Sequence, residues 1–600
     1  MNRTKIVCTL GPATVEDSVL CELIKSGMNV ARLNFSHGDH DSHREKIMQL
    51  KRLREEMNLP IATLLDTKGP EVRVKTFEKG KIALEEHDTF ILTTAECEGN
   101  EHRVSITYKD LPKDIKVGVS ILIDDGLIEM TVTEMVESDD GETDIHCRVI
   151  SGGILSNNKS CNFPGQTLSM PYLSERDKSD IIFGCEMDFD FIACSFVRCD
   201  EDVLEVRRVL EENGGKDIRI IAKIENQDGV DNIDEILRVA DGIMVARGDM
   251  GVEVPFEELP RIQKELIKKA YNSGKQAITA TQMLDSMIKN PRPTRAETTD
   301  VANAIYDGTS ALMLSGETAA GVHPIEALRT MVKIATTTEQ NIDYKKRFFG
   351  RDESHGGNVT NAIAHASVTT AIDLGARAIL TVTEKGGTAR LISKFRPPQP
   401  ILACTPNVKT WRQLSMAWGV IPIMFKEQKA IDELFEHSVD VCENLGHLST
   451  GDLAVITSGV PLGMPGTTNL MKVHVVGDVL VRGSGIGEKE VTAPVYAYPD
   501  AETLMKDFTG GSIIVVSETN NKMMPILKSA AGIVVEKGGI DSHAAIVGLS
   551  LDIPVIVGAE NATKILKTGT TVTINAKKGL VSASERENNK LQFYLNRTNF

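Results

Sequence analysis

The sequence predicts an α/β protein built on a (β/α)₈ TIM barrel, and three observations lead to this fold class. Eight short apolar runs, rich in β-branched residues, each end at polar residues or glycine. Most of them are followed by an amphipathic segment of helical period that stops at glycine, such as 201–215 and 259–274. Strands that alternate with helices eight times are the pattern of a closed parallel barrel. The runs are 5–12, 29–37, 61–70, 190–197, 219–226, 242–249, 276–283 and 311–318.

The spacing of these runs is broken once, which predicts an inserted domain. About 120 residues separate the third run from the fourth, where a barrel repeat takes about 30. Residues 71–166 carry short alternating strands with turns at glycine and aspartate, the pattern of antiparallel sheet. We therefore expect a small β-barrel lid domain at 71–166, and the catalytic barrel at 1–70 and 167–342.

Two further domains are expected after the barrel, because 600 residues are too many for one hydrophobic core. A polar, glycine-containing stretch at 345–358 marks the first boundary, and helices alternate with strands beyond it. This predicts a compact α/β domain at 343–474. A last module at 475–600 follows, and the glycines of 481–490 are typical of a turn or linker, since their spacing does not fit a dinucleotide fingerprint.

Composition excludes several classes of protein. The net charge of −17, from 84 acidic against 67 basic residues, argues against nucleic acid or an anionic membrane as partner. The ten cysteines are scattered without a Cys-x-x-Cys pair, which favours free thiols in a reducing compartment over disulfides or zinc. No apolar stretch is long enough for a spanning helix, and the first residues lack the apolar core of a signal peptide. We expect a cytoplasmic protein with no membrane contact.

Polar side chains gather where the predicted barrel strands end. In such barrels the active site lies at the carboxyl ends of the strands. Most of the eight runs end in cations, carboxylates or hydroxyls, which would therefore converge on one rim. These groups are Arg32, Asn34, Ser36, Asp66, Thr67, Lys223, Glu225, Arg247, Gly248, Asp249, Thr281, Ser315 and Glu317.

The chemical types of these groups point to phosphoryl chemistry. Glu225 and Asp249, on neighbouring strands, suit a hard divalent cation that leaves room for a substrate phosphate. The alternative is that both are buried salt-bridge partners. Lys223 lies two residues before Glu225, so both side chains face the same side of the strand. A lysine there could stabilise a phosphoryl group in transfer, and Arg32 adds a planar donor for phosphate or carboxylate.

A second group of oxygens at the rim allows two interpretations. Asn34, Ser36, Asp66 and Thr67 offer mostly neutral oxygens with one carboxylate, a set weak enough for a monovalent cation. Taken alone, they are better explained as turn and capping residues. The histidines of SHGDHDSHREK (36–46) have the spacing of a metal site, but the acidic and hydroxyl residues among them favour a capped helix start.

Seven motifs in sequence order resemble those of the pyruvate kinase family. The resemblance covers about residues 1–474 and implies the same fold: a barrel, a β lid after the third strand and a C-terminal α/β domain. The motifs are RLNFSHG (32–38), LLDTKGPEVR (64–73), KIEN (223–226), MVARGDMGVEV (244–254), ATQMLDSM (280–287), PTRAETTDVANAI (293–305) and MLSGETAAG (313–321).

This resemblance implies an enzyme that transfers the phosphoryl group of phosphoenolpyruvate to ADP, giving pyruvate and ATP in the last step of glycolysis. Family members are usually homotetramers that use Mg²⁺ (or Mn²⁺) and K⁺. By position, Arg32 would bind the substrate phosphate and Lys223 would stabilise the phosphoryl group in transfer. Glu225 and Asp249 would hold Mg²⁺, and the backbone at Gly248 would face the substrate carboxylate.

Further roles follow from the same resemblance. Thr281 would bind substrate and lie on the path of the proton to the enolate, with Ser315 and Glu317 completing the proton network. Arg73 and Lys159 would contact the nucleotide phosphates. K⁺ would be held by Asn34, Ser36, Asp66 and Thr67. Glu71 is acidic where similar K⁺-independent members carry lysine, so we expect K⁺ dependence.

The third domain carries a candidate regulatory site. In TVTEKGGTARLISKF (381–395) a threonine- and glycine-containing loop precedes a helix, which is either an anion site at the helix N-terminus or a turn. The family resemblance favours an allosteric pocket for a sugar phosphate or a nucleotide. Its predicted residues are Thr383, Lys385, Gly387 and Thr388.

The last module is similar to the phosphohistidine domain of phosphoenolpyruvate-utilising enzymes. The similarity rests on GGIDSHAAIVGLSLDIPVIVG (538–558) and covers about 475–585, with His543 as the phosphate-carrying histidine. The chain departs from that pattern, because Gly548 and Leu549 stand where Ala-Arg is expected and no ATP-grasp partner domain is present. We therefore expect a structural or regulatory role for this module rather than phosphotransfer.

Two other functions remain open from the residues alone. A barrel lyase or aldolase also uses a pair of acidic metal ligands, but it would need no ADP and no cationic lid. A phosphoryl carrier or sensor built around His543 would survive the loss of Lys223. Formation of ATP from phosphoenolpyruvate and ADP separates the kinase from both.

Overall fold

The computed structural model describes residues 2–137, 141–350, 358–426, 431–459, 468–477 and 479–583. Part of the predicted boundary stretch, 351–357, and the end of the last module lie outside the described residues. The chain divides into two compact units, of which the first holds residues 1–368, 381–427 and 457–470. None of the helices formed by the described residues is long and apolar enough to cross a membrane.

A closed ring of eight parallel strands forms the centre of the first unit, in the order β1-β17-β16-β15-β14-β13-β3-β2. Each strand begins and ends within one of the eight predicted runs, so the (β/α)₈ barrel is confirmed. β1 pairs with β17 on one side and β2 on the other, which closes the ring. The strands are β1 (Lys5–Thr9), β2 (Val30–Asn34), β3 (Ala62–Asp66), β13 (Phe191–Cys194), β14 (Arg219–Ile224), β15 (Gly242–Ala246), β16 (Gln276–Ala280) and β17 (Ala311–Leu314).

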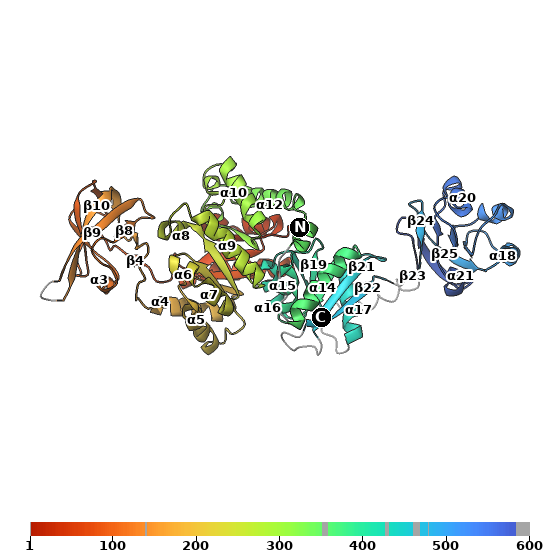
Figure 1. Cartoon of the computed structure of the whole chain (residues 1–600), viewed down its shortest axis with the longest axis horizontal. Coiled ribbons are helices and arrows are strands. Elements are labelled where there is room, and N and C mark those ends of the chain that lie inside the picture. The colour runs from red at the N-terminus through yellow and green to blue at the C-terminus, as the bar shows by residue number, and fades with distance from the viewer. Residues whose placement is uncertain are drawn as a thin grey trace. The chain divides into compact units, whose positions relative to one another are not determined.

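Helices surround the ring of strands (Figure 1), and local sequence explains where several of them begin and end. Ser174 and Thr294 each cap a helix by accepting a hydrogen bond from the third backbone N–H. Gly27 and Gly308 end helices in the left-handed conformation that glycine adopts without strain. The long helices are α1 (Asp17–Ser26), α2 (His40–Glu56), α4 (Glu175–Glu186), α5 (Asp200–Glu212), α7 (Ile233–Val239), α9 (Leu259–Asn272), α10 (Arg295–Asp307) and α12 (Pro324–Gln340).

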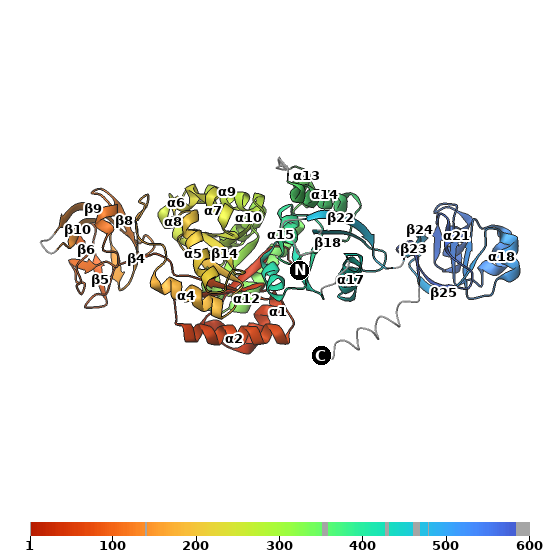
Figure 2. The ribbon, with the colours of Figure 1, turned by 90° about the horizontal axis from the view of Figure 1, so that it is seen from below.

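Short helices follow several strands at the rim, and two hydrophobic layers stabilise the barrel. One layer fills the ring itself, with Phe191 and Met244 among its buried members, and the other lies between strands and helices. Figure 2 shows α1 and α2 side by side on the outside. The short helices of this region are η1 (Pro12–Thr14), α6 (Gln227–Asp231), α8 (Arg247–Glu253), η2 (Asp285–Ile288), α11 (Gly316–Ala319) and α13 (Tyr344–Phe349).

Between β3 and β13 the chain forms the β structure expected there. Seven strands form one sheet in the order β4-β12-β8-β9-β10-β6-β7, and β11 pairs with β5. An antiparallel bridge between Val74 and Ile106 links the ends of the two edge strands. The elements are β4 (Val72–Arg73), β5 (Lys81–Leu84), β6 (Thr89–Thr93), β7 (Arg103–Ser105), α3 (Leu111–Asp114), β8 (Ser120–Ile123), β9 (Ile128–Glu137), β10 (Thr143–Ser151), β11 (Gly153–Ser156) and β12 (Ser160–Asn162).

Helices and strands alternate again after the barrel, as the sequence predicts. β19 and β20 pair in parallel. The elements are α14 (Val359–Asp373), β18 (Ala378–Val382), α15 (Gly387–Lys394), β19 (Ile401–Thr405), α16 (Val408–Gln413), η3 (Leu414–Met416), β20 (Val420–Met424), α17 (Ile431–Asn444), β21 (Leu453–Gly459) and β22 (Thr468–Val475).

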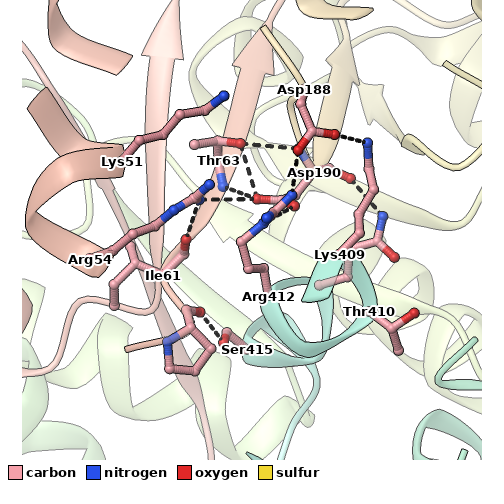
Figure 3. A network of polar contacts seen from close by, with 12 residues as sticks. Lys51, Arg54, Ile61, Thr63, Asp188, Asp190, Lys409, Thr410, Arg412 and Ser415 are labelled. Atoms are coloured by element: carbon pink, nitrogen blue, oxygen red, sulfur yellow. Dashed lines mark hydrogen bonds and ion pairs between the residues drawn. The ribbon is translucent and has the colours of Figure 1, made fainter. Parts of the chain in front are cut away.

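A network of buried charges holds α16 against the amino-terminal end of the barrel (Figure 3). Asp190 immediately precedes β13 and is fully buried. Its carboxylate lies 2.7 Å from Arg412 Nε and 3.6 Å from Arg54 Nη1. It also accepts hydrogen bonds from the backbone N–H and the hydroxyl of Thr63, at 2.9 and 3.1 Å. Asp190 therefore helps to bind the end of the barrel opposite the rim to α16.

The last module is an eight-stranded sheet in the order β23-β30-β29-β25-β26-β27-β28-β24, with α20 and α21 beside it (Figure 1). Alternate residues of β26 face two separate hydrophobic clusters, one containing residues of α20 and the other residues of α21. The elements are β23 (Val479–Arg482), β24 (Ser484–Ile486), β25 (Glu490–Ala497), α18 (Ala501–Asp507), β26 (Ile513–Val516), η4 (Asn521–Met523), α19 (Met524–Leu527), β27 (Gly532–Val535), α20 (His543–Leu551), β28 (Val555–Val557), α21 (Ala562–Ile565), β29 (Thr571–Asn575) and β30 (Leu580–Ala583).

Candidate active site

Lys223 lies at the centre of the polar rim. It is the fifth residue of β14, and its Nζ lies 3.1 Å from Asp66 Oδ1 and 3.0 Å from Glu225 Oε1. The same ammonium group donates a hydrogen bond of 2.6 Å to Ser195 Oγ. Burial alone would lower the pKa of Lys223, but the charges of Asp66, Glu225 and Asp249 outweigh it and raise that pKa above its usual value. The rim therefore keeps a lysine that is fully charged.

Arg32 shares the carboxylate of Asp66 with this lysine. Arg32 Nε lies 2.6 Å from Asp66 Oδ2, and its Nη1 donates to Thr9 Oγ1 at 2.9 Å. Burial raises the pKa of Asp66, but the charges of Arg32 and Lys223 outweigh it and hold that pKa below the ordinary value. Asp66 thus fixes two cations side by side at the mouth of the barrel, as phosphate recognition requires.

Glu225 follows β14 directly and is fully buried. Its Oε2 accepts a hydrogen bond of 2.7 Å from the backbone N–H of Phe196, whereas Oε1 accepts none from any described residue. Burial, with a further contribution from Asp249, raises the pKa of Glu225 to about 8 even though Lys223 lowers it. A divalent cation at the unbonded oxygen would offset this cost.

Asp249, in the first turn of α8, is the second predicted metal ligand. Its charge acts on Glu225, and also on Asp125 in the turn between β8 and β9 of the lid. No group of three or more histidine, cysteine or acidic side chains able to hold a metal occurs among the described residues. Two carboxylates fit a Mg²⁺ ion whose remaining positions are filled by water and substrate.

The loop after β16 carries Thr281 in a strained backbone conformation. Thr281 has φ of 69° and the next residue, Gln282, has φ of 53°, a region that non-glycine residues rarely occupy. The hydroxyl of Thr281 accepts a hydrogen bond of 2.7 Å from the backbone N–H of Gly248. Arg247 stabilises this loop, because its guanidinium donates to the carbonyl oxygen of Thr281 at 2.7 Å and pairs with Asp300 at 2.7 Å. Such strain is typical of functional sites.

Ser315 and Glu317 meet after β17. Glu317 is almost fully buried, and burial raises its pKa. Its Oε2 accepts a hydrogen bond of 2.7 Å from the N–H of Ser315, and its Oε1 accepts one of 3.0 Å from the N–H of Leu284. The hydroxyl oxygen of Ser315 is buried without a hydrogen-bond partner in the described part of the chain. A protonatable acid and a hydroxyl group therefore lie next to each other.

The four predicted K⁺ ligands come from the neighbouring strands β2 and β3, where Asn34 stands directly opposite Asp66. Asn34 Oδ1 accepts a hydrogen bond of 3.1 Å from the N–H of Ser36. Thr67 Oγ1 accepts one of 3.2 Å from the N–H of Ser195. These hydrogen bonds fit the turn and capping interpretation in part, and the K⁺ site stays a prediction.

The two predicted nucleotide contacts lie on paired lid strands. Arg73 in β4 pairs in register with Ser160 of β12, which follows Lys159. The guanidinium of Arg73 donates to both oxygens of Glu71, at 2.8 and 3.0 Å, and Lys159 Nζ lies 2.7 Å from Asp124 Oδ1. Both cations therefore have acidic partners that nucleotide phosphates would have to replace.

A cavity of about 700 Å³, open solvent included, lies between lid residues and barrel loops. Its lining includes Glu71 and Val72 from the lid side, and Phe196 and Asp249 from the barrel side. It therefore connects the base of the lid with the acidic side of the rim.

Two further residues belong to this site and were not predicted from the sequence. Ser195 follows β13 and connects three site residues, because it accepts from Lys223, donates to the carbonyl oxygen of Thr67 at 2.7 Å and lies 3.4 Å from Asp66 Oδ1. Thr9 ends β1 and holds Arg32. The same rule that identified the other groups, a polar residue at the carboxyl end of a strand, would have found both.

The predicted allosteric residues lie around the start of α15. Lys385 and Gly387 are exposed, while the hydroxyl of Thr388 lies 2.8 Å from that of Thr468. The carbonyl oxygen of Lys385 accepts hydrogen bonds from Arg390 at 2.8 Å and from Arg219 at 3.1 Å. Arg219 opens β14, so this loop is bonded directly to a barrel strand.

His543 begins α20 in the last module and is half-buried. Its Nδ1 lies 2.9 Å from Thr519 Oγ1 and its Nε2 lies 3.0 Å from Asn521 Oδ1. Because an amide oxygen can only accept, Nε2 carries the proton and Nδ1 accepts from the threonine. Both ring nitrogens are therefore engaged.

Comparison with known proteins gives matches along the whole chain. Residues 1–328 match the family model of the pyruvate kinase barrel domain, residues 361–474 that of the pyruvate kinase alpha/beta domain, and residues 508–579 that of the mobile domain of PEP-utilising enzymes. The chain is 49% identical to a pyruvate kinase of Sporosarcina psychrophila over 583 residues, which is 97% of this chain and 99% of that protein. It is 48% identical to a pyruvate kinase of Geobacillus stearothermophilus over 579 residues, 96% of this chain and 98% of that protein.

Proposed function

The chain belongs to the pyruvate kinase family and transfers the phosphoryl group of phosphoenolpyruvate to ADP, and from this premise we propose which of its residues carry out each part of the reaction. One observation carries the proposal: Lys223 and Arg32 share the buried carboxylate of Asp66, while the unbonded oxygen of Glu225 lies 3.0 Å from the same lysine. Two cations and a candidate metal-binding acid thus lie together around one buried carboxylate.

In the transfer step Arg32 binds the phosphate of phosphoenolpyruvate, and Lys223 stabilises the charge on the phosphoryl group as ADP attacks in line. Glu225 and Asp249 would hold Mg²⁺ or Mn²⁺, which would supply positive charge to offset that of the phosphoryl group. Asp66 and Ser195 keep the lysine in place, so little reorganisation accompanies the transfer. The backbone N–H of Gly248 exchanges its bond with Thr281 for the substrate carboxylate.

The second step protonates the enolate of pyruvate that the transfer leaves behind. Thr281 lies on the path of the proton, and Ser315 and Glu317 supply the network behind it. The raised pKa of Glu317 supports this role, because a protonated carboxyl group can donate to the neighbouring hydroxyl. Closure of the lid excludes water and brings Arg73 and Lys159 onto the nucleotide phosphates.

Replacement of Lys223 by methionine tests the assignment. The methionine keeps most of the side-chain length but removes the charge, so kcat should fall about a hundredfold or more while the KM for phosphoenolpyruvate changes little. ATP formation from phosphoenolpyruvate and ADP, followed through a coupled hexokinase reaction, measures both. Lys268→Met, the same change at an exposed position of α9, is the matched control. Near-normal turnover in Lys223→Met would remove this residue from the mechanism.

K⁺ dependence is proposed from Glu71 together with the oxygens of Asn34, Ser36, Asp66 and Thr67. Turnover should fall at least tenfold when K⁺ is replaced by tetramethylammonium at constant ionic strength. In Glu71→Lys the cationic side chain would take over the charge of K⁺, so the loss should shrink to a few-fold at most. Equal turnover of the wild type with and without K⁺ would end this part of the proposal.

The remaining proposals concern an effector site, the oligomeric state and the cellular location. The loop of Thr383, Lys385, Gly387 and Thr388 is proposed to bind a sugar phosphate or a nucleotide, supported by its bonds to Arg219 of the barrel. We also propose a cytoplasmic homotetramer, on the family resemblance. A screen of phosphorylated sugars and nucleotides at subsaturating phosphoenolpyruvate, with the mass in solution measured by light scattering, tests both.

A further inference from the structure

The loop that follows β13, residues 195–198, holds two active-site groups that β14 presents. Ser195 Oγ accepts the hydrogen bond of 2.6 Å from Lys223, and the backbone N–H of Phe196 donates to Glu225 Oε2 at 2.7 Å. Phe196 has φ of 55°, a left-handed value that is rare outside glycine and typical of functional sites. A displacement of this loop would therefore move the acceptor of Lys223 and the donor to Glu225 together.

The same loop also holds the segment through which the chain returns from the lid to the barrel. This segment, residues 163–173, is called here the return segment. Arg198 Nη1 donates to the carbonyl oxygens of Leu168 and Met170, at 2.9 and 3.1 Å. The two carboxylate oxygens of Asp202 each accept from a different guanidinium nitrogen of Arg198, both at 3.1 Å. Because the Asp202 side chain is only 7% exposed, this two-point contact fixes the guanidinium firmly.

Tyr172 joins the return segment to the loop at a second point. It is buried, and its hydroxyl donates to the carbonyl oxygen of Ser195 at 3.0 Å. Three alternate residues of the return segment, Leu168, Met170 and Tyr172, thus bond the loop that holds the active-site groups.

The return segment is bonded to the lid as well. The backbone N–H and the hydroxyl of Ser169 both donate to the carboxylate of Asp114, each at 2.8 Å. Leu168 and Met170 pack against the hydrophobic core of the lid. Carbonyl oxygens of residues 168–170 therefore bond the barrel, while the residue between them bonds the lid. Movement of the lid against the barrel must displace one of these two sets of contacts.

We propose that Arg198 is a positioning residue that couples the lid to the active site. It fastens the return segment to the loop that holds Lys223 and Glu225, so the position of the lid and the geometry of these two groups depend on each other. The proposal rests on the roles proposed above for Lys223, Glu225 and the lid, and adds the residue that connects them. Loss of Arg198 should therefore weaken binding at both ends of the connection, the metal at the barrel and the nucleotide at the lid.

Two measurements on the full-length protein, one at each end of the connection, test the proposal. Binding of Mn²⁺ alone, followed as free Mn²⁺ by EPR without substrate or nucleotide, reports on Glu225. The KM for ADP, from ATP formation at saturating phosphoenolpyruvate, reports on the lid. Arg198→Met should weaken Mn²⁺ binding and raise the KM for ADP, each about threefold or more, since it removes a charged hydrogen-bond donor. Arg198→Lys keeps the charge and one donor, and should recover part of both losses.

Two further variants separate coupling from a general loss of structure. Tyr172→Phe removes one hydroxyl without leaving a buried charge, so it should shift both measurements in the same direction by a smaller factor. Arg208→Met is the matched control, because the Arg208 side chain is 59% exposed on α5 and pairs there with Glu201. It should leave both measurements unchanged.

Glu225→Gln distinguishes failure of this proposal from failure of the metal site. It should weaken Mn²⁺ binding about tenfold or more. If it does, and Arg198→Met shifts neither measurement or only one of them, the coupling is overturned while the metal site stands. If Mn²⁺ binding is unchanged in Glu225→Gln, the proposed metal role of Glu225 is overturned, and the coupling with it.

Discussion

The charge of Lys223 depends on neighbours that no single segment of the chain supplies. Asp66 comes from β3 and Ser195 follows β13, and both contact the ammonium group within 3.1 Å. Glu225, the residue directly after β14, is a charged neighbour from the same segment of chain as Lys223. The residue is therefore positioned by three strands at once, which is why a small movement of any one of them would alter the transfer step.

His43 shows the opposite case, a histidine that stays neutral for structural reasons. Its ring stacks on Phe35 with 4.0 Å between centres, and its Nε2 donates to the carbonyl oxygen of His37 at 2.9 Å. Its Nδ1 is buried without a partner among the described residues. Burial lowers the pKa of His43 to about 4, with smaller effects of Lys46 and His40, against the hydrogen bond to His37 and the charge of Asp39.

A pH dependence of stability follows from that lowered pKa. Between about pH 6.5 and pH 4 the unfolded chain binds a proton at His43 that the folded chain does not, so the free energy of unfolding should fall as the pH falls through this window, by at most about 3 kcal/mol. His43→Gln keeps a donor for His37 but cannot titrate, so its Tm should fall less between pH 7.5 and pH 5. His87→Gln, an exposed lid histidine, should behave like the wild type. An unchanged slope in His43→Gln would contradict this account.

At the scale of elements, α16 is held to the barrel by ion pairs of different burial, which Arg412 and Lys409 make (Figure 3). Arg412 reaches Asp190, which is fully buried, at 2.7 Å. Lys409, on the same helix, reaches Asp188, whose side chain is 52% exposed, at 2.6 Å. Arg412 also lies 2.7 Å from Asp188, so it contacts both acids, whereas Lys409 contacts the half-exposed one.

Substitution of these two residues should therefore have unequal effects. Arg412→Met leaves the buried carboxylate of Asp190 with the more distant Arg54 and the hydrogen bonds from Thr63, and should destabilise the protein by about 3 kcal/mol. Lys409→Met removes a partly exposed pair and should cost less than about 1 kcal/mol. Urea unfolding, followed by tryptophan fluorescence, measures both, since Trp411 lies in α16 itself. Equal shifts of the unfolding midpoint would show that burial does not decide the strength of these contacts.

At the scale of the whole molecule, the net charge of −17 must coexist with substrates that are all anions. The structure meets this with cations brought together locally, Arg32 and Lys223 at the active-site rim. Long-range attraction of substrate is thereby weak, and binding depends on short contacts.

The last module raises a separate point, because its histidine, His543, stands where phosphohistidine domains carry phosphate. Both nitrogens of His543 are already engaged, by Thr519 and Asn521. We therefore expect His543→Ala to change kcat and KM by less than twofold, and we expect no acid-labile phosphate on the wild-type protein after incubation with phosphoenolpyruvate. Acid-labile phosphate that is absent from His543→Ala would show that the module does carry phosphate.

The sequence by itself determined the barrel and the composition of its rim. Apolar runs, polar strand ends and helix caps are local features, so the eight strands and the groups at their ends could be read without coordinates. The pairing of charged side chains could not be predicted in the same way. That Arg32 and Lys223 share Asp66, and that Arg412 reaches back to Asp190, are results of strand order and domain docking. Such contacts join residues far apart in the chain, and only the packed fold fixes the distances over which charge acts.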